Sequence, residues 1–189
     1  SVDARLRLDP FTLSVGQAVA VDGETTATLK GEIEADDVSW TVSLDAAVEQ
    51  VEVARARELW PESLRPGMRK WLAANIEAGT LHDARWSVRA VPGSQPDISM
   101  SQRFTGAEVR VLQTFPPLVK GVGTMVAHDH AFTILVEEGE MAAPQGGIVD
   151  ASGSVFRVPD TRLKPARAEV IFDAVGTVTA GLSIIALAP

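Results

Sequence analysis

The stretch Val38-Ser39-Trp40-Thr41-Val42-Ser43-Leu44 decides the fold class, because apolar and polar residues alternate strictly along it. A period of two places the apolar side chains on one face of an extended strand and the polar side chains on the other. The same alternation returns in Val2-Asp3-Ala4-Arg5-Leu6-Arg7-Leu8 and in Ala84-Arg85-Trp86-Ser87-Val88-Arg89-Ala90. The sequence therefore predicts a mainly β fold whose sheet has one apolar and one polar face.

Short turn signals separate the alternating segments, and Asp or Gly supplies most of them. The expected tips are Asp22-Gly23, Asp36-Asp37, His128-Asp129, Glu138-Gly139, Gln145-Gly146-Gly147 and Ser152-Gly153. Strands joined by loops this short must be antiparallel neighbours, since a parallel pair needs a crossover of roughly a dozen residues. We expect a long, curved antiparallel meander.

One segment has helical spacing instead, with apolar residues at Met68, Trp71, Leu72 and Ile76. Pro66 suits the first turn of a helix and Gly79 suits a C-terminal stop. The spacing predicts a helix near residues 64–78. A shorter helical turn, ended by a proline, is expected over Glu58-Leu59-Trp60-Pro61.

These patterns divide the chain into three parts of one continuous module. A first β block covers 1–55, a helical insert covers 56–80, and a second β block covers 81–189. One helix is too small for the apolar face of about ten strands, which at roughly 4.8 Å per strand would extend about 48 Å. The face must close into a barrel, fold over as a sandwich, or curl into a groove that holds an apolar ligand.

The composition fits a globular domain with no nucleic-acid partner. Hydrophobic residues make up 46% of the chain and charged residues 22%, so it is not a disordered sequence. The net charge is -8 and the basic residues are scattered, whereas binding to a phosphate backbone needs clustered Lys and Arg. Because there is no cysteine, a disulfide, a Cys-containing zinc site and a thiol nucleophile are excluded.

Both ends of the sequence read as interrupted strand pattern, over Val2–Leu8 and again over Ile184–Pro189. Neither a signal peptide nor a run of roughly 18 apolar residues is present. We therefore expect the chain to be part of a larger protein, whose anchor and targeting signal lie outside it.

The motifs of common enzymes are missing from the sequence. It contains no G-x-S-x-G elbow, no phosphate-binding Walker loop and no G-x-G-x-x-G that opens a helix. The glycines of Gly121-Val122-Gly123-Thr124 and Ser152-Gly153-Ser154 lie within strand and turn patterns, where they are typical of bulges and tight bends. We expect no catalytic residue, no cofactor and no enzymatic activity.

His128-Asp129-His130 is the one segment with metal-like spacing. Alternate residues of a strand share a face, so both imidazoles could meet one ion, and a metal-dependent enzyme is the corresponding hypothesis. The other interpretation is a polar hairpin tip in which Asp129 favours the turn. Because His82 is remote in sequence and no third ligand is evident, we expect no metal to bind there.

The candidate ligand-contacting residues are the apolar side chains of the alternating segments. They are Val38, Trp40, Val42, Leu44, Trp86, Val88, Val109, Val111, Phe132, Ile134, Val136, Val170 and Phe172. We expect this face to be incompletely covered by protein. Either these side chains form an ordinary core, or they contact an acyl lipid.

The central segment resembles the AsmA-like family, especially its YhdP- and TamB-type members. The matching residues are Leu59-Trp60-Pro61, Arg69-Lys70-Trp71-Leu72, Asn75-Ile76 and Gly79-Thr80-Leu81. The stretch from Phe104 to Asp160 is also similar, with Phe115-Pro116-Pro117-Leu118 before a Gly-rich strand. The resemblance covers roughly residues 38–189.

This resemblance implies repeated β-groove units that bind phospholipid acyl chains and help to move lipid between the inner and outer membranes of a Gram-negative envelope. It also implies a periplasmic location behind an N-terminal membrane anchor, and adjoining repeats of the same chain as partners. The family offers no catalytic residue. The alternative is a structural or protein-interaction β domain with a self-closed core and no ligand.

Overall fold

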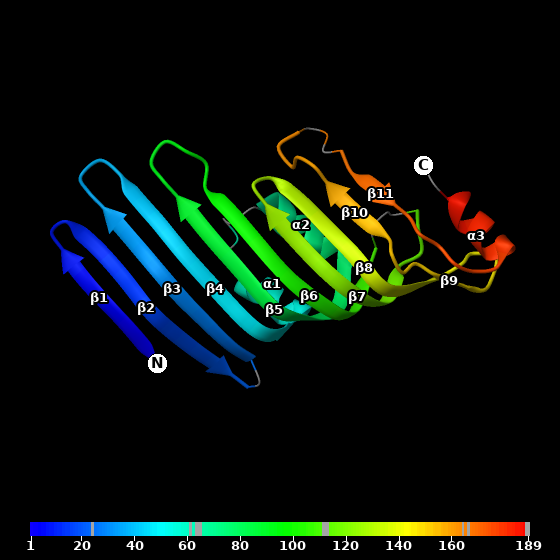
Figure 1. Cartoon of the computed structure of the whole chain (residues 1–189), viewed down its shortest axis with the longest axis horizontal. Coiled ribbons are helices and arrows are strands. Elements are labelled where there is room, and N and C mark those ends of the chain that lie inside the picture. Colours follow the sequence, from blue (N-terminus) through cyan, green and yellow to red (C-terminus); the bar gives the residue numbers. More distant parts are fainter. Residues whose placement is uncertain are drawn as a thin grey trace.

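The structure is a computed structural model that describes residues 1–23, 25–60, 62, 66–110, 114–163, 165 and 167–187. Over these residues the chain forms one antiparallel sheet of eleven strands with three short helices (Figure 1). The sheet does not close on itself. The predicted curved, mainly β meander is therefore confirmed.

The elements follow one another as the alternation predicts. The first half contains β1 (Val2–Leu8), β2 (Phe11–Asp22), β3 (Thr25–Ala35), β4 (Trp40–Glu52), α1 (Val53–Leu59) and α2 (Pro66–Asn75). The second half contains β5 (Ile76–Ala90), β6 (Asp97–Val109), β7 (Leu118–His128), β8 (Ala131–Ala142), β9 (Ile148–Asp150), β10 (Val155–Val158), β11 (Glu169–Ile171) and α3 (Val178–Ile185). The strand order is β1-β2-β3-β4-β5-β6-β7-β8-β10-β11, and β9 pairs with β8.

The register carries the two-residue alternation from strand to strand, because directly opposed residues share a face. One apolar row crosses the sheet from β1 to β10 through Val2, Ala18, Leu29, Ala46, Trp86, Met100, Ala127, Phe132 and Val158. On the opposite face, the row next to it contains Lys30, Asp45, Ser87 and Ser99. We call these two sides the apolar face and the polar face.

Helix α2 covers the apolar face where β8 and β10 lie. The indole of Trp71 stacks on the ring of Phe156 at 5.9 Å, with an angle of 15° between the planes. It also meets Phe132 edge-on at 6.0 Å. Figure 1 shows α1 and α2 together behind β5–β8.

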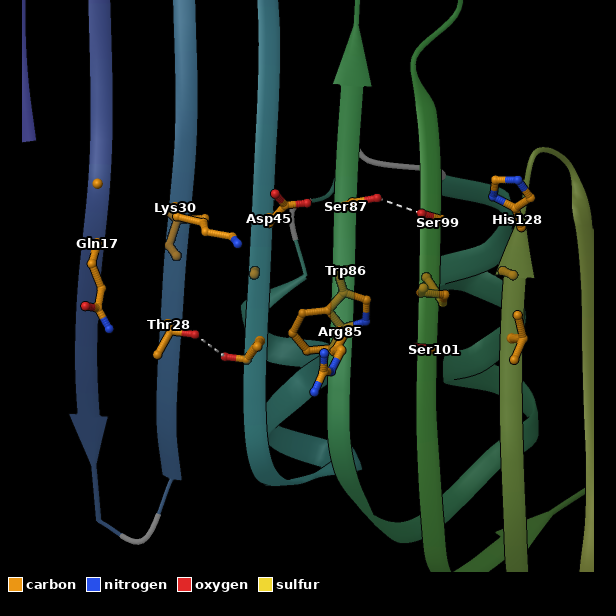
Figure 2. A pocket seen from close by; sticks show the side chains of 17 residues that line it. Gln17, Thr28, Lys30, Asp45, Arg85, Trp86, Ser87, Ser99, Ser101 and His128 are labelled. Atoms are coloured by element: carbon orange, nitrogen blue, oxygen red, sulfur yellow. Dashed lines mark hydrogen bonds between the residues drawn. The ribbon is translucent and has the colours of Figure 1, made fainter.

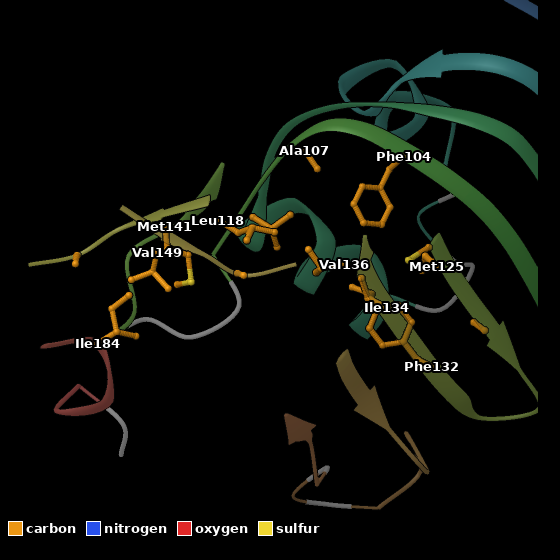
Figure 3. Close-up of a cluster of buried hydrophobic side chains, with 14 of the residues drawn as sticks. Phe104, Ala107, Leu118, Met125, Phe132, Ile134, Val136, Met141, Val149 and Ile184 are labelled. Carbon is orange, nitrogen blue, oxygen red and sulfur yellow. The ribbon is translucent and has the colours of Figure 1, made fainter. Parts of the chain in front are cut away.

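A smaller buried cluster lies between β4 and β5, and the larger core is closed over the second half of the sheet. Its buried residues come from β6 to β9 and from α3, as Figure 3 shows for Phe104, Val136, Met141 and Ile184. Towards β1 the apolar face becomes exposed, and the Leu8 side chain keeps 76% of its surface accessible. Helix α1 reaches β2 through the ion pair of Arg55 with Asp22 at 3.0 Å, and towards β1 the apolar row loses its cover.

The helical insert begins and ends earlier than predicted. Helix α1 starts directly after β4, and α2 ends at Asn75, whose side-chain amide donates to the Trp71 carbonyl at 2.7 Å. The predicted stop, Gly79, lies inside β5 with a φ of 139°. A Cβ there would lie 3.1 Å from Cα of Ala107, so the glycine permits the close approach of β5 and β6 instead.

Two further expectations are wrong. The predicted tip at Glu138-Gly139 lies inside β8, where Gly139 is buried and a Cβ would lie 2.7 Å from Cδ1 of Leu118. The final segment is helical instead of extended, because α3 begins at an N-cap in which Thr177 Oγ1 accepts from the amide of Ala180. Ile184 is fully buried within that helix.

Among the described residues, no helix is long and apolar enough to cross a membrane.

Candidate functional site

Strands β4 and β5 bring five of the predicted lining residues together on the apolar face. Trp40, Val42 and Leu44 alternate along β4, and Leu44 lies directly opposite Val88 of β5. Trp86 continues the same face and packs against both buried clusters. Trp40 keeps 56% of its surface exposed, while Val42, Leu44, Trp86 and Val88 are half-buried. This part of the prediction describes an accessible apolar surface.

Val38 does not belong to that surface. It lies in the turn before β4, is 94% exposed, and donates its amide to Oδ1 of Asp36 at 2.9 Å. This amide, together with the amide and hydroxyl of Ser39, lowers the pKa of the Asp36 carboxyl. The alternation predicted a strand from residue 38, but the Asp36 side chain binds these amides and turns the chain instead.

Four predicted lining residues lie in the closed core. Val109, Phe132, Ile134 and Val136 have exposed fractions between 6% and 9%. The expectation that they are incompletely covered is wrong, because α2 and the aromatic side chains of Phe156, Phe172 and Phe115 pack over this region.

Val170 and Phe172 lie at the last strand of the sheet. Val170 is on β11, and the ring of Phe172 contacts that of Phe115 edge-on at 6.3 Å. Together with Val109 and Val136 they border a cavity of only about 60 Å³. Val111 lies outside the described residues.

A larger apolar pocket, which we call the α2 pocket, lies between α2 and the ends of β6, β7, β8 and β10. Its volume is about 410 Å³, within the range of about 300–1,000 Å³ that is common for ligand sites. Its apolar lining comprises Trp71, Ile98, Met100, Ala127, Ala131, Phe132, Phe156 and Val158. His128, Asp129, His130 and Thr161 form a polar rim.

Within the apolar lining, Phe132 was predicted from the sequence to contact a ligand, and Trp71 was placed on the apolar side of the predicted helix. Phe156 and Val158 alternate with Val155 and Arg157, and this alternation could have indicated that Phe156 faces the same side of the sheet as Val158. Ile98 and Met100 alternate with serines in β6, and the same signal could have shown them. The local sequence pattern does not show that α2 approaches the sheet and closes the pocket.

A second hollow, of about 830 Å³, crosses β2 to β7 (Figure 2), and part of the apolar row, from Leu29 through Trp86 to Ala127, belongs to its lining. Polar residues share this lining, and the hydroxyls of Ser87 and Ser99 are hydrogen-bonded at 2.6 Å. Lys30 and Arg85 project from it, while Asp45 is ion-paired with Arg89 at 2.7 Å. Among the residues of this lining, Trp86 was predicted from the sequence to contact a ligand.

His128 and His130 do not share a face, because the chain reverses between them at Asp129. The amide of His130 donates back to the carbonyl of His128 at 2.8 Å and closes the tip. The predicted hairpin tip is therefore confirmed. We expected no metal because a third ligand was not evident in the sequence. The structure brings one close, since donor atoms of Asp97, His128 and Asp129 all lie within 4.8 Å of one another.

An ion pair sits beside this tip. Arg162 donates to both carboxylate oxygens of Asp160, at 2.9 and 2.8 Å, and its backbone amide donates as well. The side-chain hydrogen bonds and then the amide lower the pKa of Asp160 to about 2. Both residues are outside the pocket lining, and they anchor the loop that follows β10.

The chain matches no known family model, no curated protein and no solved structure. The resemblance to the AsmA-like family therefore stays a prediction.

Proposed function

We propose that the chain is an AsmA-like β-groove module that binds phospholipid acyl chains and helps to transport lipid between the inner and outer membranes. One observation supports this most directly. The apolar row runs without interruption from the exposed apolar face of β1–β3, through Trp86, to Met100, Ala127 and Phe132 in the wall of the α2 pocket. An extended hydrocarbon chain fits the geometry of such a row.

The exposure of the first strands favours an apolar occupant. Leu6, Leu8, Leu29 and Trp40 are each more than a third exposed on the apolar face. Soluble monomers rarely leave contiguous apolar patches larger than a few hundred Å². Burying about ten methylene groups against such a surface would contribute roughly 8 kcal/mol before the entropic cost of ordering the lipid chain.

This function needs no specific polar group. The acyl chains would lie on the apolar face while the head group stays in water, which agrees with the absence of any enzymatic motif in the sequence. In the same proposal the module lies on the periplasmic side of an inner-membrane-anchored protein. Adjoining repeats would extend the sheet at β1, because β1 is one end of the strand order.

The test uses two neighbouring positions on opposite faces of β3. A photo-crosslinking amino acid replaces Leu29, on the apolar face, or Lys30, on the polar face, and the protein is irradiated in cells. We expect phospholipid adducts, detected by mass spectrometry, at Leu29 and not at Lys30. Equal labelling at both positions, or no adduct at either, would contradict lipid binding on this face.

Charged substitutions in the buried part of the face are unsuitable for this test. Val109 and Ile134 lie in the closed core, so Val109→Glu or Ile134→Asp would unfold the module whether or not it binds lipid. Leu29 is partly exposed and avoids this ambiguity.

The closed core from β6 to β9 favours the second candidate, a structural or protein-interaction β domain without a ligand. In that case no lipid would co-purify, and the exposed apolar face of β1–β3 would be buried against another protein. Native mass spectrometry of the purified module distinguishes the two functions by the presence or absence of bound lipid.

A further inference from the structure

We propose that Asp97, His128 and Asp129 bind a divalent transition-metal ion at the β7–β8 tip. This inference does not depend on lipid binding. It comes from side chains on two neighbouring strands: Asp97 is the first residue of β6, His128 is the last of β7, and Asp129 follows at the tip.

The donor atoms already have nearly the spacing that an ion requires. Nε2 of His128 and Oδ2 of Asp129 lie 3.3 Å apart. With bonds of about 2.0–2.1 Å, two ligands of a tetrahedral zinc ion are separated by roughly 3.3–3.4 Å. A donor atom of Asp97 lies within 4.8 Å of both. Asp97 is exposed, so rotation of its side chain can close the remaining gap.

The fold places these residues together for two reasons. Strands β6 and β7 are antiparallel partners, with Met100 opposite Ala127, so the start of β6 lies beside the end of β7. Asp129 has a φ of 54°, a left-handed conformation that Asp tolerates better than most residues. The tight tip keeps the Asp129 carboxylate beside the imidazole of His128 instead of on the opposite side of a strand.

The charge of the cluster suits a divalent cation. Two carboxylates and a neutral imidazole carry two negative charges, and imidazole with carboxylates is a usual donor set for zinc. Arg89, which lies opposite Asp97 in the register, is ion-paired with Asp45. Arg162 is close enough to sense the charge of Asp129, but its guanidinium is held by Asp160. Within the described residues, no ion pair occupies Asp97.

An ion at this position would act on the α2 pocket. His128 and Asp129 belong to the rim of the pocket, and Asp97 precedes Ile98 of its lining. A bound ion would therefore connect the first residue of β6 to the hairpin tip at the mouth. Three protein ligands leave at least one position for water or for an anionic group of a ligand.

Isothermal titration with Zn²⁺ alone tests the site. We expect one ion per parent chain, and at least roughly tenfold weaker binding in Asp97→Asn and in His128→Ala. His130→Ala is the matched control, since it removes a neighbouring imidazole outside the cluster, and it should bind as the parent does. Ca²⁺ should bind much more weakly, because it prefers six to eight oxygen ligands.

Several results would overturn the proposal. They are an absence of binding to the parent chain up to about 1 mM Zn²⁺, unchanged affinity in Asp97→Asn, and lost affinity in His130→Ala. Circular dichroism of each variant checks the fold, and we expect unchanged spectra because Asp97 and His128 are exposed and His130 is only half-buried.

Discussion

Replacing Trp71 with alanine would measure how firmly α2 is docked on the sheet. The indole makes two ring contacts, stacked on Phe156 and edge-on to Phe132. Such a pair contributes about 0.5–1.5 kcal/mol beyond the buried area, and truncation of a fully buried Trp costs about 3–5 kcal/mol. Because Trp71 is half-buried, we expect Trp71→Ala to lower the free energy of unfolding by about 2–3 kcal/mol.

Trp40→Ala is the matched control, since the same side chain is removed from the uncovered part of the apolar face. It should change the free energy of unfolding by less than about 1 kcal/mol. For a chain of this length, the loss of free energy expected for Trp71→Ala corresponds to a fall in Tm of about 5–10 °C. Urea unfolding followed by circular dichroism measures both variants. Equal effects of the two substitutions would refute the docking of α2 described above.

Two other predictions concern the backbone and the pH dependence. Gly31 has a φ of 151°, and a Cβ there would overlap the carbonyl oxygen of Ser43. Gly31→Ala should therefore lower the free energy of unfolding by about 3 kcal/mol. Gly23 lies at a turn with open space around it, so Gly23→Ala should lower the free energy of unfolding by about 1 kcal/mol. Urea titrations in which Gly23→Ala is the more destabilising variant would be inconsistent with this register. The pKa of Asp160 is lowered from 3.8 to about 2, so the stabilisation by its pair with Arg162 is present above about pH 4 and is lost as the pH falls towards 2. Thermal unfolding should show a small difference between the parent chain and Asp160→Asn at pH 5 that is largely lost at pH 2, and a difference of the same size at both pH values would exclude this pair as its source.

The faces of the sheet could be predicted from sequence because alternation is a local property. Leu44 and Val88 were assigned to one face, and the register places them opposite each other. Which part of that face is covered could not be predicted in this way. The burial of Ile134 and the exposure of Trp40 depend on where α2 docks, which is a tertiary contact.

The errors at the C-terminal end and at the tip have separate physical causes. A short apolar run such as Ile184-Ile185 suits a buried helix as well as a strand, and periodicity alone does not distinguish them. The metal-like cluster was missed because Asp97 is distant from His128 in sequence and reaches it only through the pairing of β6 with β7. For His130, the rule that alternate residues share a face failed because a turn intervenes.

The order of the strands has a consequence for how the molecule tolerates change. From β1 to β8 every strand pairs with its neighbours in sequence, so the sheet resembles a one-dimensional array in which each unit is held mainly by those beside it. Local opening should therefore require little free energy at β1 and much more at β7, where the core is closed. Hydrogen exchange would follow this gradient, and a strand could be gained or released at the β1 edge while the other end of the sheet keeps its packing.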